Sequence, residues 1–314
     1  MSRIDEALRR AEPGSPDTAI VNRPQAGEAG VSAVFTSPWT FGADEKTPDH
    51  EAVAAPAIVA DGDLSTLPKD AMALFKGFRA DVVGRIVAAP GAPPVLAEQF
   101  RRLAAALHHL QLSQGTKIIM VTSANPGDGK TLTSTNLALT LSESYRRQVL
   151  LIDADLRRPS LHEIFQLPNL VGLNDGLQSA SEGRLDVIKI TDSLTLLPAG
   201  RPNPDPMSAL ASDRMREVLR EAASRFDWVI VDTAPLGLLA DANLLTTMID
   251  GALLVIRANA TPHANVERAL ESLGRSKVLG VVLNAVDPTS KDQDTYGRGY
   301  LTDTPSPPLP AVQD

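Results

Sequence analysis

Residues 123–131 read SANPGDGKT and combine the groups that phosphate binding needs. Glycines in such a loop let backbone N–H groups turn inward around a phosphate, the lysine reaches the outer phosphates, and the threonine hydroxyl can hold Mg²⁺. The apolar run 117–122 precedes the loop and a helical pattern over 132–141 follows it, which is the context of a P-loop. We therefore expect a nucleoside triphosphate to be bound by Pro126, Gly127, Asp128, Gly129, Lys130, Thr131 and Leu132.

The P-loop match is incomplete, because Ala124 stands where the general pattern has its first glycine. Two later runs strengthen it, namely VLLIDADLR at 149–157 and WVIVDTAP at 228–235. A short apolar run that ends in aspartate is typical of a buried parallel strand that delivers a carboxylate to the ligand edge of the sheet. We expect this of Asp153 and Asp232, the alternative being that they only cap strand ends.

Composition narrows the possible functions. The chain has 314 residues, a formal net charge of −8 and no cysteine, and its five histidines show no metal-ligand spacing. The acidic charge argues against a nucleic-acid partner, and the missing cysteines exclude structural disulfides and thiolate metal sites. No apolar stretch approaches the roughly 20 residues that span a bilayer, and the first residues lack a signal-peptide core. We expect a cytoplasmic protein.

The chain divides into five segments by pattern. We expect a short amphipathic helix at 1–11, a disordered linker rich in Pro, Gly and Ala at 12–68, a helical extension at 69–94, a P-loop domain at 95–287 and a flexible tail at 288–314. The extension shows a helical stripe over 69–89.

Strand and helix patterns alternate through the P-loop domain. Beyond the P-loop unit, helices are expected at 96–112, after 160, at 207–225, 241–248 and 263–275, and strands at 148–153, 194–198, 227–232, 251–257 and 278–284. The alternation predicts an α/β P-loop fold with a doubly wound, mostly parallel sheet and flanking helices.

These motifs, together with LPAGRPNPDP at 197–206 and tyrosines near the C-terminus, resemble the bacterial tyrosine kinases (BY-kinases) of exopolysaccharide synthesis. The resemblance covers about residues 95–300. The opening MSRIDEALRRA also resembles the exosortase-associated, chain-length-determinant branch of that family. The family implies an ATP- and Mg²⁺-dependent tyrosine autokinase that regulates export or chain length of a surface polysaccharide.

The resemblance implies roles for the carboxylates. Asp153 would join the Mg²⁺ environment and act as the candidate base for a tyrosine hydroxyl, Asp155 would support it, and Asp232 would hold the metal together with Thr131. A phenol with a pKa near 10 is protonated at neutral pH, so a nearby proton acceptor is useful. Lys130 would neutralise developing phosphate charge. Arg157 and Arg158 either clamp phosphate or pair with Asp155, and the sequence leaves this open.

The tail supplies the candidate phosphate acceptors. Only three tyrosines exist, and two of them, Tyr296 and Tyr300, lie in DTYGRGYLTD. The last expected strand ends at Asn284 on the nucleotide edge of a parallel sheet, so the tail starts near the phosphates. Asn284 is itself a candidate contact to the nucleotide base, or else a buried strand-end asparagine.

Partners follow from the resemblance and not from composition. Members that lack a membrane span act with a separate membrane polysaccharide co-polymerase, which would activate this chain and hold it at the inner membrane, and a phosphatase would reverse the reaction. The family also uses Glu-x-x-Arg-x-x-Arg on the helix before the first strand to form rings. Here Glu98 and Arg101 fit, but Ala104 takes the third position, which leaves homo-oligomerisation open.

Two alternatives remain open. A partition or division-site ATPase shares the sheet, the loop and the distal aspartate, but it uses a loop lysine at the position of Asn125, and often binds DNA. A non-kinase regulator that binds ATP and a polysaccharide-assembly partner is opposed only by the tail tyrosines and by Asp153 and Asp155.

Overall fold

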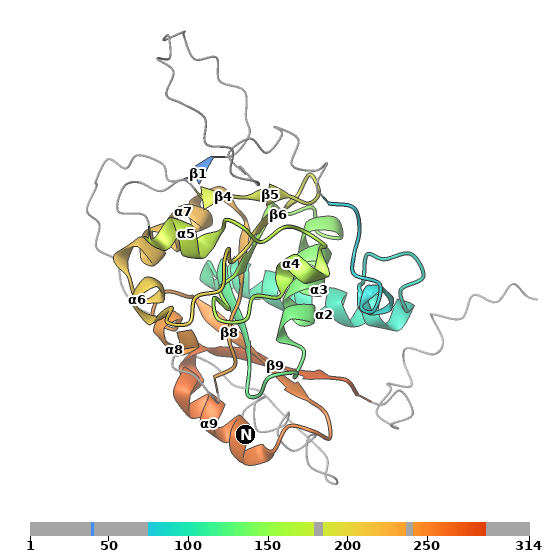
Figure 1. The fold of residues 1–314 in the computed structure, drawn as a ribbon. Helices are drawn as coiled ribbons and strands as arrows, with labels where there is room; N and C mark the ends of the chain where they lie inside the picture. The colour runs from blue at the N-terminus through green and yellow to red at the C-terminus, as the bar shows by residue number, and fades with distance from the viewer. Residues whose placement is uncertain (1–38, 41–74, 179–184, 237–240, 287–314) are drawn as a thin grey trace, which may run out of the picture.

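The computed structural model describes residues 39–40, 75–178, 185–236 and 241–286. A seven-stranded sheet in the order β5-β6-β3-β7-β2-β8-β9 forms its centre (Figure 1). All neighbouring strands are parallel except the β5–β6 pair, which is antiparallel. The bounds are β2 (Ile118–Ser123), β3 (Val149–Asp153), β5 (Ile188–Lys189), β6 (Leu194–Leu197), β7 (Trp228–Asp232), β8 (Gly251–Arg257) and β9 (Val278–Asn284). A separate parallel pair joins β1 (Trp39–Thr40) to β4 (Leu185–Asp186).

Helices cover both faces of the sheet (Figure 1). Two apolar cores result, because successive strand residues point to opposite faces. One core joins the sheet to α7 and α9, and the other joins it to α2, α3 and α4. The helices are α2 (Pro94–Gln114), α3 (Lys130–Glu143), α4 (Leu161–Ile164), α5 (Leu173–Gln178), α6 (Met207–Leu210), α7 (Asp213–Arg225), α8 (Asp241–Leu245) and α9 (His263–Leu273), with 3₁₀ turns η3 (Val83–Arg85) and η4 (Arg275–Lys277).

The register of the central strands sets the positions of the acidic residues. Asp153 at the end of β3 lies directly beside Asp232 at the end of the parallel strand β7. Strand β2, which leads into the P-loop, lies on the other side of β7. Three neighbouring carboxyl ends therefore bring the P-loop and both aspartates to one edge of the sheet, as the apolar runs ending in aspartate predicted.

The fold class is confirmed, and the expected strands lie within one or two residues of their predicted bounds. The helix expected at 207–225 is divided into α6 and α7, because Ser212 caps a new helix by accepting a hydrogen bond from the Met215 N–H at 3.1 Å. The helix expected after 160 is only the four-residue α4, and α5, β4 and β5 were not expected.

The helix expected over 69–89 is wrong in its described part. Residues 75–93 form turns and the single 3₁₀ turn η3. Gly77 has a φ of 136° and Gly84 lies in the middle of the stripe, and glycines disfavour a helix interior. The apolar residues of this segment pack into the core that also contains α2, α3 and α4 instead. The predictions for 1–11, for most of 12–68 and for 288–314 lie outside the described residues.

Within the described ranges, no helix combines the length and the apolar character needed to cross a membrane.

Candidate nucleotide and phosphoryl-transfer site

The P-loop lies over a cavity of about 550 Å³ at the carboxyl edge of the sheet. Gly127 and Gly129 have φ values of 83° and 100°, which residues other than glycine rarely adopt. Gly129 is the N-cap residue directly before α3. The α3 N-terminus therefore carries free backbone N–H groups and the positive end of the helix dipole, as anion binding requires. The cavity is lined by Pro126, Gly127, Gly129, Lys130, Thr131, Leu132, Asp155, Arg157, Arg158, Ser160, Ala234 and Pro235.

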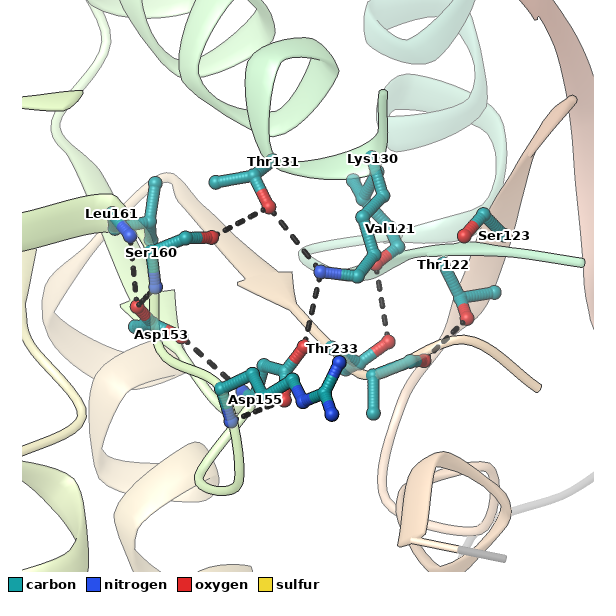
Figure 2. Close-up of polar contacts among 12 residues, drawn as sticks. Val121, Thr122, Ser123, Lys130, Thr131, Asp153, Asp155, Ser160, Leu161 and Thr233 are labelled. Atoms are coloured by element: carbon teal, nitrogen blue, oxygen red, sulfur yellow. Dashed lines mark hydrogen bonds and ion pairs between the residues drawn. The ribbon is translucent and has the colours of Figure 1, made fainter. Parts of the chain in front are cut away.

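Lys130 points into this site and pairs with Asp155. Figure 2 shows its Nζ between the Thr131 hydroxyl, 3.3 Å away, and the Asp155 carboxylate, 3.1 Å away. Burial opposes the lysine charge, but the Asp232, Asp155 and Asp153 carboxylates outweigh it and raise the pKa of Lys130 above its usual value. The site therefore holds a charged ammonium group next to the P-loop.

Asp153 lies beneath the cavity and is held by the turn before α4. Its Oδ2 accepts hydrogen bonds from the Ser160 and Leu161 N–H groups, each at 3.0 Å (Figure 2). Its side chain is fully buried, and it does not line the cavity. Burial and the neighbouring Asp232 raise the pKa of Asp153 to about 8, while the Leu161 N–H and Lys130 oppose the rise.

Asp232 is the least satisfied polar group in the site. It is fully buried, and neither carboxylate oxygen makes a hydrogen bond of ordinary geometry within the described residues. Burial raises the pKa of Asp232 to about 6, against the opposing effects of Lys130 and the Thr131 hydroxyl. Two buried carboxylates lie side by side here, and the nearby Lys130 ammonium group offsets only part of the cost of burying them.

This donor set fits Mg²⁺. Among the described residues there is no group of three His, Cys, Asp or Glu side chains that could hold a metal unaided. Mg²⁺ in nucleotide sites does not need one, because it is bound through one or two carboxylates, waters and the phosphates themselves. Asp232, Asp153 and Thr131 supply that arrangement. The Thr131 hydroxyl lies 3.0 Å from the Ser160 hydroxyl, which links the P-loop to the turn that holds Asp153.

On the opposite side, side-chain hydrogen bonds hold the P-loop in place. We call the residues that make them the loop brace: Asn125, Asp128, Thr261, Asn265 and Asn284. The buried Asp128 accepts from its own loop at the Asn125 N–H, 2.8 Å away, and from the Thr261 hydroxyl at 2.8 Å. Asn265 donates to the Asn125 side-chain oxygen at 2.8 Å. Asn284 donates to the Asp128 backbone carbonyl at 2.8 Å. The loop is thereby tied to β9 and to the segment around the start of α9.

Gly129 is enclosed by this brace. A Cβ atom at that position would lie 1.9 Å from Nδ2 of Asn284, so the close approach of strand β9 requires a glycine there. Asn284 was expected to contact the nucleotide base or to be a buried strand-end residue. Its amide instead braces the P-loop, and a contact to the base stays a prediction.

Most of the predicted site residues meet here. Six of the loop residues line the cavity, whereas Asp128 and Asn284 brace the loop from outside it. Arg157 and Arg158 line the cavity, and the Arg157 guanidinium donates to the Pro204 carbonyl. Asp155 Oδ1 accepts from the Arg158 backbone N–H at 3.1 Å. Tyr296 and Tyr300 lie outside the described residues.

Sequence reasoning missed Thr261, Asn265 and Ser160. Their hydroxyl and amide groups lie in loops or at helix starts, where Ser, Thr and Asn are ordinary, so no local pattern marks them. The structure shows where the residues of the expected ring motif lie on α2. Ala104 is fully buried against the domain, so its side chain does not belong to a contact surface, while Glu98 pairs with Arg101 at 3.7 Å and Arg102 at 3.5 Å.

Comparison with known proteins agrees with this geometry. Residues 119–298, more than half of the chain, match the family model described as the CobQ/CobB/MinD/ParA nucleotide binding domain. The chain is 35% identical over 216 residues to the tyrosine-protein kinase YwqD of Bacillus subtilis, covering 68% of this chain and 91% of that one. It is 33% identical over 189 residues to the tyrosine-protein kinase CpsD of Streptococcus agalactiae, covering 58% of this chain and 81% of that one.

Longer relatives match only over part of their length. The tyrosine-protein kinase wzc of Salmonella typhimurium is 29% identical over 234 residues, which is 73% of this chain but 32% of that one. Among solved structures, the kinase domain of the Escherichia coli tyrosine kinase ETK superimposes with a TM-score of 0.58 at 32% identity, covering 62% of this chain and 77% of that one. The chain belongs to the bacterial tyrosine kinase family, within the CobQ/CobB/MinD/ParA nucleotide-binding domains.

Proposed function

We propose that this protein is an ATP- and Mg²⁺-dependent tyrosine autokinase that phosphorylates Tyr296 and Tyr300 of its own tail. One observation carries the proposal: a P-loop lysine paired with Asp155 lies over two buried, adjacent carboxylates, in a chain that spans 91% of a tyrosine-protein kinase. Mg²⁺ bound by Thr131, Asp153 and Asp232 would neutralise the charge that develops on the phosphates.

ATP binding would rearrange the Lys130–Asp155 ion pair. Lys130 would turn to the β- and γ-phosphates, which releases the Asp155 carboxylate at the cavity wall. The tyrosine oxygen attacks the γ-phosphorus, the bond to the bridging oxygen breaks, ADP leaves, and the phenol proton passes to a carboxylate. This sequence uses positioning and charge neutralisation, which are the main contributions in phosphoryl transfer.

Two carboxylates compete for the role of base. Asp153 was expected to accept the proton, but its side chain is fully buried, whereas Asp155 lines the cavity. The variants Asp153→Asn and Asp155→Asn separate the roles at saturating Mg²⁺ and ATP. Loss of the base lowers kcat by about 10²- to 10⁴-fold without changing the affinity for Mg²⁺. Loss of a metal ligand instead raises the Mg²⁺ concentration needed for half-maximal rate.

The tail is long enough to reach the site. Asn284 ends β9 beside the P-loop, and Tyr296 follows it by twelve positions. A coil of that length spans about 20 Å, so transfer within one chain or to a neighbour is open.

The remaining proposals rest on the family resemblance. The kinase would regulate exopolysaccharide synthesis or export, belong to the exosortase-associated branch, be activated at the inner membrane by a membrane co-polymerase protein and be reset by a phosphatase.

We retain the division of the chain into the segments 1–11, 12–68, 69–94, 95–287 and 288–314, with residues 75–93 packed on the P-loop domain. Ring formation through α2 remains a proposal, with Arg102 beside Arg101 on the exposed face.

Phosphosite mass spectrometry with Mg²⁺ and ATP tests the proposal, on the protein alone and with the cytoplasmic segments of its membrane partner. Phosphate on Tyr296 or Tyr300 is expected in the wild type and is expected to fall by about 10³-fold in Lys130→Met. Lys277→Met is the matched control, because among the described residues the Lys277 ammonium group donates only to the Ile249 carbonyl, at 2.8 Å. ATP binding with unmodified tyrosines under both conditions would favour the non-kinase regulator.

A further inference from the structure

Residues 75–93, which we call the strap, pack across α4 and the residues that follow it. The Arg79 N–H donates to the Ile164 carbonyl at 3.0 Å, and its guanidinium bonds the Glu163 carboxylate at 2.5 Å. Gln166 donates to the Phe78 carbonyl at 2.6 Å. The ring of Phe165 lies 5.8 Å from that of Phe75 and 5.5 Å from that of Phe78. Backbone, charge and aromatic contacts therefore all join the strap to α4.

The strap is also joined to α3, the helix that begins at the P-loop. Asn136, 1% exposed, accepts from the Val87 N–H at 2.9 Å and donates to the Arg85 carbonyl at 2.8 Å. A buried amide that pairs with both a backbone donor and a backbone acceptor fixes the strap in one position. Ile86, between these two residues, is fully buried in the same core as Leu137. The strap, drawn in cyan, lies along the side of the domain where α3 and α4 are found (Figure 1).

The two helices that the strap joins hold the two halves of the site. Thr131 lies in the first turn of α3, five residues before Asn136. The start of α4 supplies the Ser160 and Leu161 N–H groups that hold Asp153, and the Ser160 hydroxyl lies 3.0 Å from that of Thr131. The α4 helix has only four residues, so its own hydrogen bonds do little to fix its position.

We propose that the strap is a positioning element that sets the spacing between the P-loop helix and the turn that holds Asp153, with Asn136, Arg79 and Glu163 as its positioning residues. Through this spacing it controls the rate of phosphoryl transfer while leaving nucleotide binding intact. The proposal rests on the proposed kinase function. A displacement of about 1 Å of a group that positions the reactants can cost up to about 10²-fold in rate.

Two kinds of variant test it in the full-length protein. Asn136→Leu keeps the side-chain volume but leaves the strap backbone groups unpaired, and Arg79→Glu replaces the attraction to Glu163 by repulsion. The double variant Arg79→Glu with Glu163→Arg restores the pair in reverse. Arg216→Glu is the matched control, since Arg216 is 44% exposed, close to the 41% of Arg79, and pairs with Asp213 on the distant helix α7.

The expected results separate positioning from general stability. Asn136→Leu lowers kcat for tail phosphorylation by about 10-fold and Arg79→Glu by about 3-fold, while the Kd for ATP stays within about twofold. The reversed pair recovers the wild-type rate, and Arg216→Glu has no effect. Unchanged kcat in both strap variants overturns the proposal, and so does a loss of ATP affinity that matches the loss of kcat.

Hydrogen exchange without nucleotide keeps this test independent of the kinase assay. The proposal predicts faster exchange of the amides of residues 160–165 in Asn136→Leu and Arg79→Glu than in the wild type and Arg216→Glu. If the wild type transfers no phosphate but this pattern is found, the proposed function fails and the role of the strap in holding α4 stands. If exchange of these amides is unchanged, the strap proposal fails whatever the kinase activity.

Discussion

The two sides of the P-loop differ in how fully their polar groups are satisfied. On the side of the loop brace, both oxygens of Asp128 accept hydrogen bonds and Asn284 covers the Asp128 carbonyl. On the other side, Asp153 and Asp232 are fully buried next to each other, and Asp232 forms no regular hydrogen bond among the described residues. Lys130, paired with Asp155, lies between the two sides.

The difference separates two tasks. Buried polar groups that form their hydrogen bonds destabilise the protein little. Their hydrogen bonds also hold a loop of unusual backbone geometry in one conformation before the ligand binds. A buried carboxylate that accepts no hydrogen bond, as Asp232 accepts none of regular geometry among the described residues, destabilises the protein even with the Lys130 ammonium group nearby, so a cation bound there would offset that cost. The brace preorganises the phosphate-binding loop, and the carboxylate side makes the site dependent on its ligands.

Gly129→Ala tests the brace most severely. The added Cβ would lie 1.9 Å from Nδ2 of Asn284, so either the loop or β9 must move. We expect ATP affinity to fall by about 10²-fold, measured by titration calorimetry, because the backbone donors no longer converge on the phosphates. Gly115→Ala is the control, since Gly115 has a φ of 69° but no atom near the Cβ position.

The double variant Gly129→Ala with Asn284→Ala sharpens that test. Removing the amide opens space for the Cβ, so part of the lost affinity should return, and the backbone strain at a φ of 100° should remain. If Gly129→Ala binds ATP like the wild type, the brace does not fix the loop.

Asp232→Asn tests the opposite side. The pKa of Asp232 in the folded protein, about 6, lies above its ordinary value of 3.8, so the folded state binds more protons than the unfolded state between these values. The free energy of unfolding of the nucleotide-free protein therefore falls as the pH rises through this window. We expect Asp232→Asn to raise it by about 3 kcal/mol at pH 8, because one pKa unit corresponds to about 1.4 kcal/mol.

The gain from Asp232→Asn should shrink steadily as the pH falls to about 4, where the folded wild-type carboxyl is protonated and the unfolded one is about half protonated. Urea denaturation at pH 8, 6 and 4 measures it. A variant that is less stable than the wild type at pH 8 would contradict the view that burial of this carboxylate destabilises the folded protein.

Thr261→Val gives the smallest expected effect. It keeps the side-chain shape but removes the hydroxyl that donates to Asp128 and accepts from the Arg257 N–H at 2.9 Å. We expect the free energy of unfolding to fall by about 1 kcal/mol, and ATP affinity to fall by less than about 10-fold, because the other Asp128 oxygen keeps its partner. Thr246→Val is the control, because within the part of the chain that the structure describes it removes a hydroxyl that bonds only to the Asn243 carbonyl.

The sequence predicted the carboxylate side better than the brace. Asp153 and Asp232 each follow a buried apolar run, and in a parallel sheet such runs end at the same edge, so a local pattern was enough. The brace joins Asp128 to Thr261 across 133 residues and to Asn284 across 156, and no local pattern encodes such contacts. The role of Asp128 as a brace could therefore not be read from the P-loop motif.

Long-range contacts also explain why the helix α7 was predicted correctly and the helix over residues 69–89 was not. The apolar stripe of α7 includes Met215, Val218 and Leu219, with Ser212 as cap and no glycine inside. The strap shows a comparable stripe, but Gly77 and Gly84 interrupt it. Its backbone hydrogen bonds close short turns or reach α4 and Asn136, and they do not continue as a helical ladder. Tertiary contacts decided its conformation, which propensity alone could not foresee.

The most direct test of the central claim is proton release on binding of ADP with Mg²⁺ at pH 7, measured by titration calorimetry in buffers of different ionisation enthalpy. The raised pKa of Asp153 keeps this carboxyl largely protonated at pH 7, so a metal ion bound beside it should displace the proton, and we expect binding to release close to one proton. Asp153→Asn should release none. An observed enthalpy that is the same in every buffer for the wild type would contradict the claim.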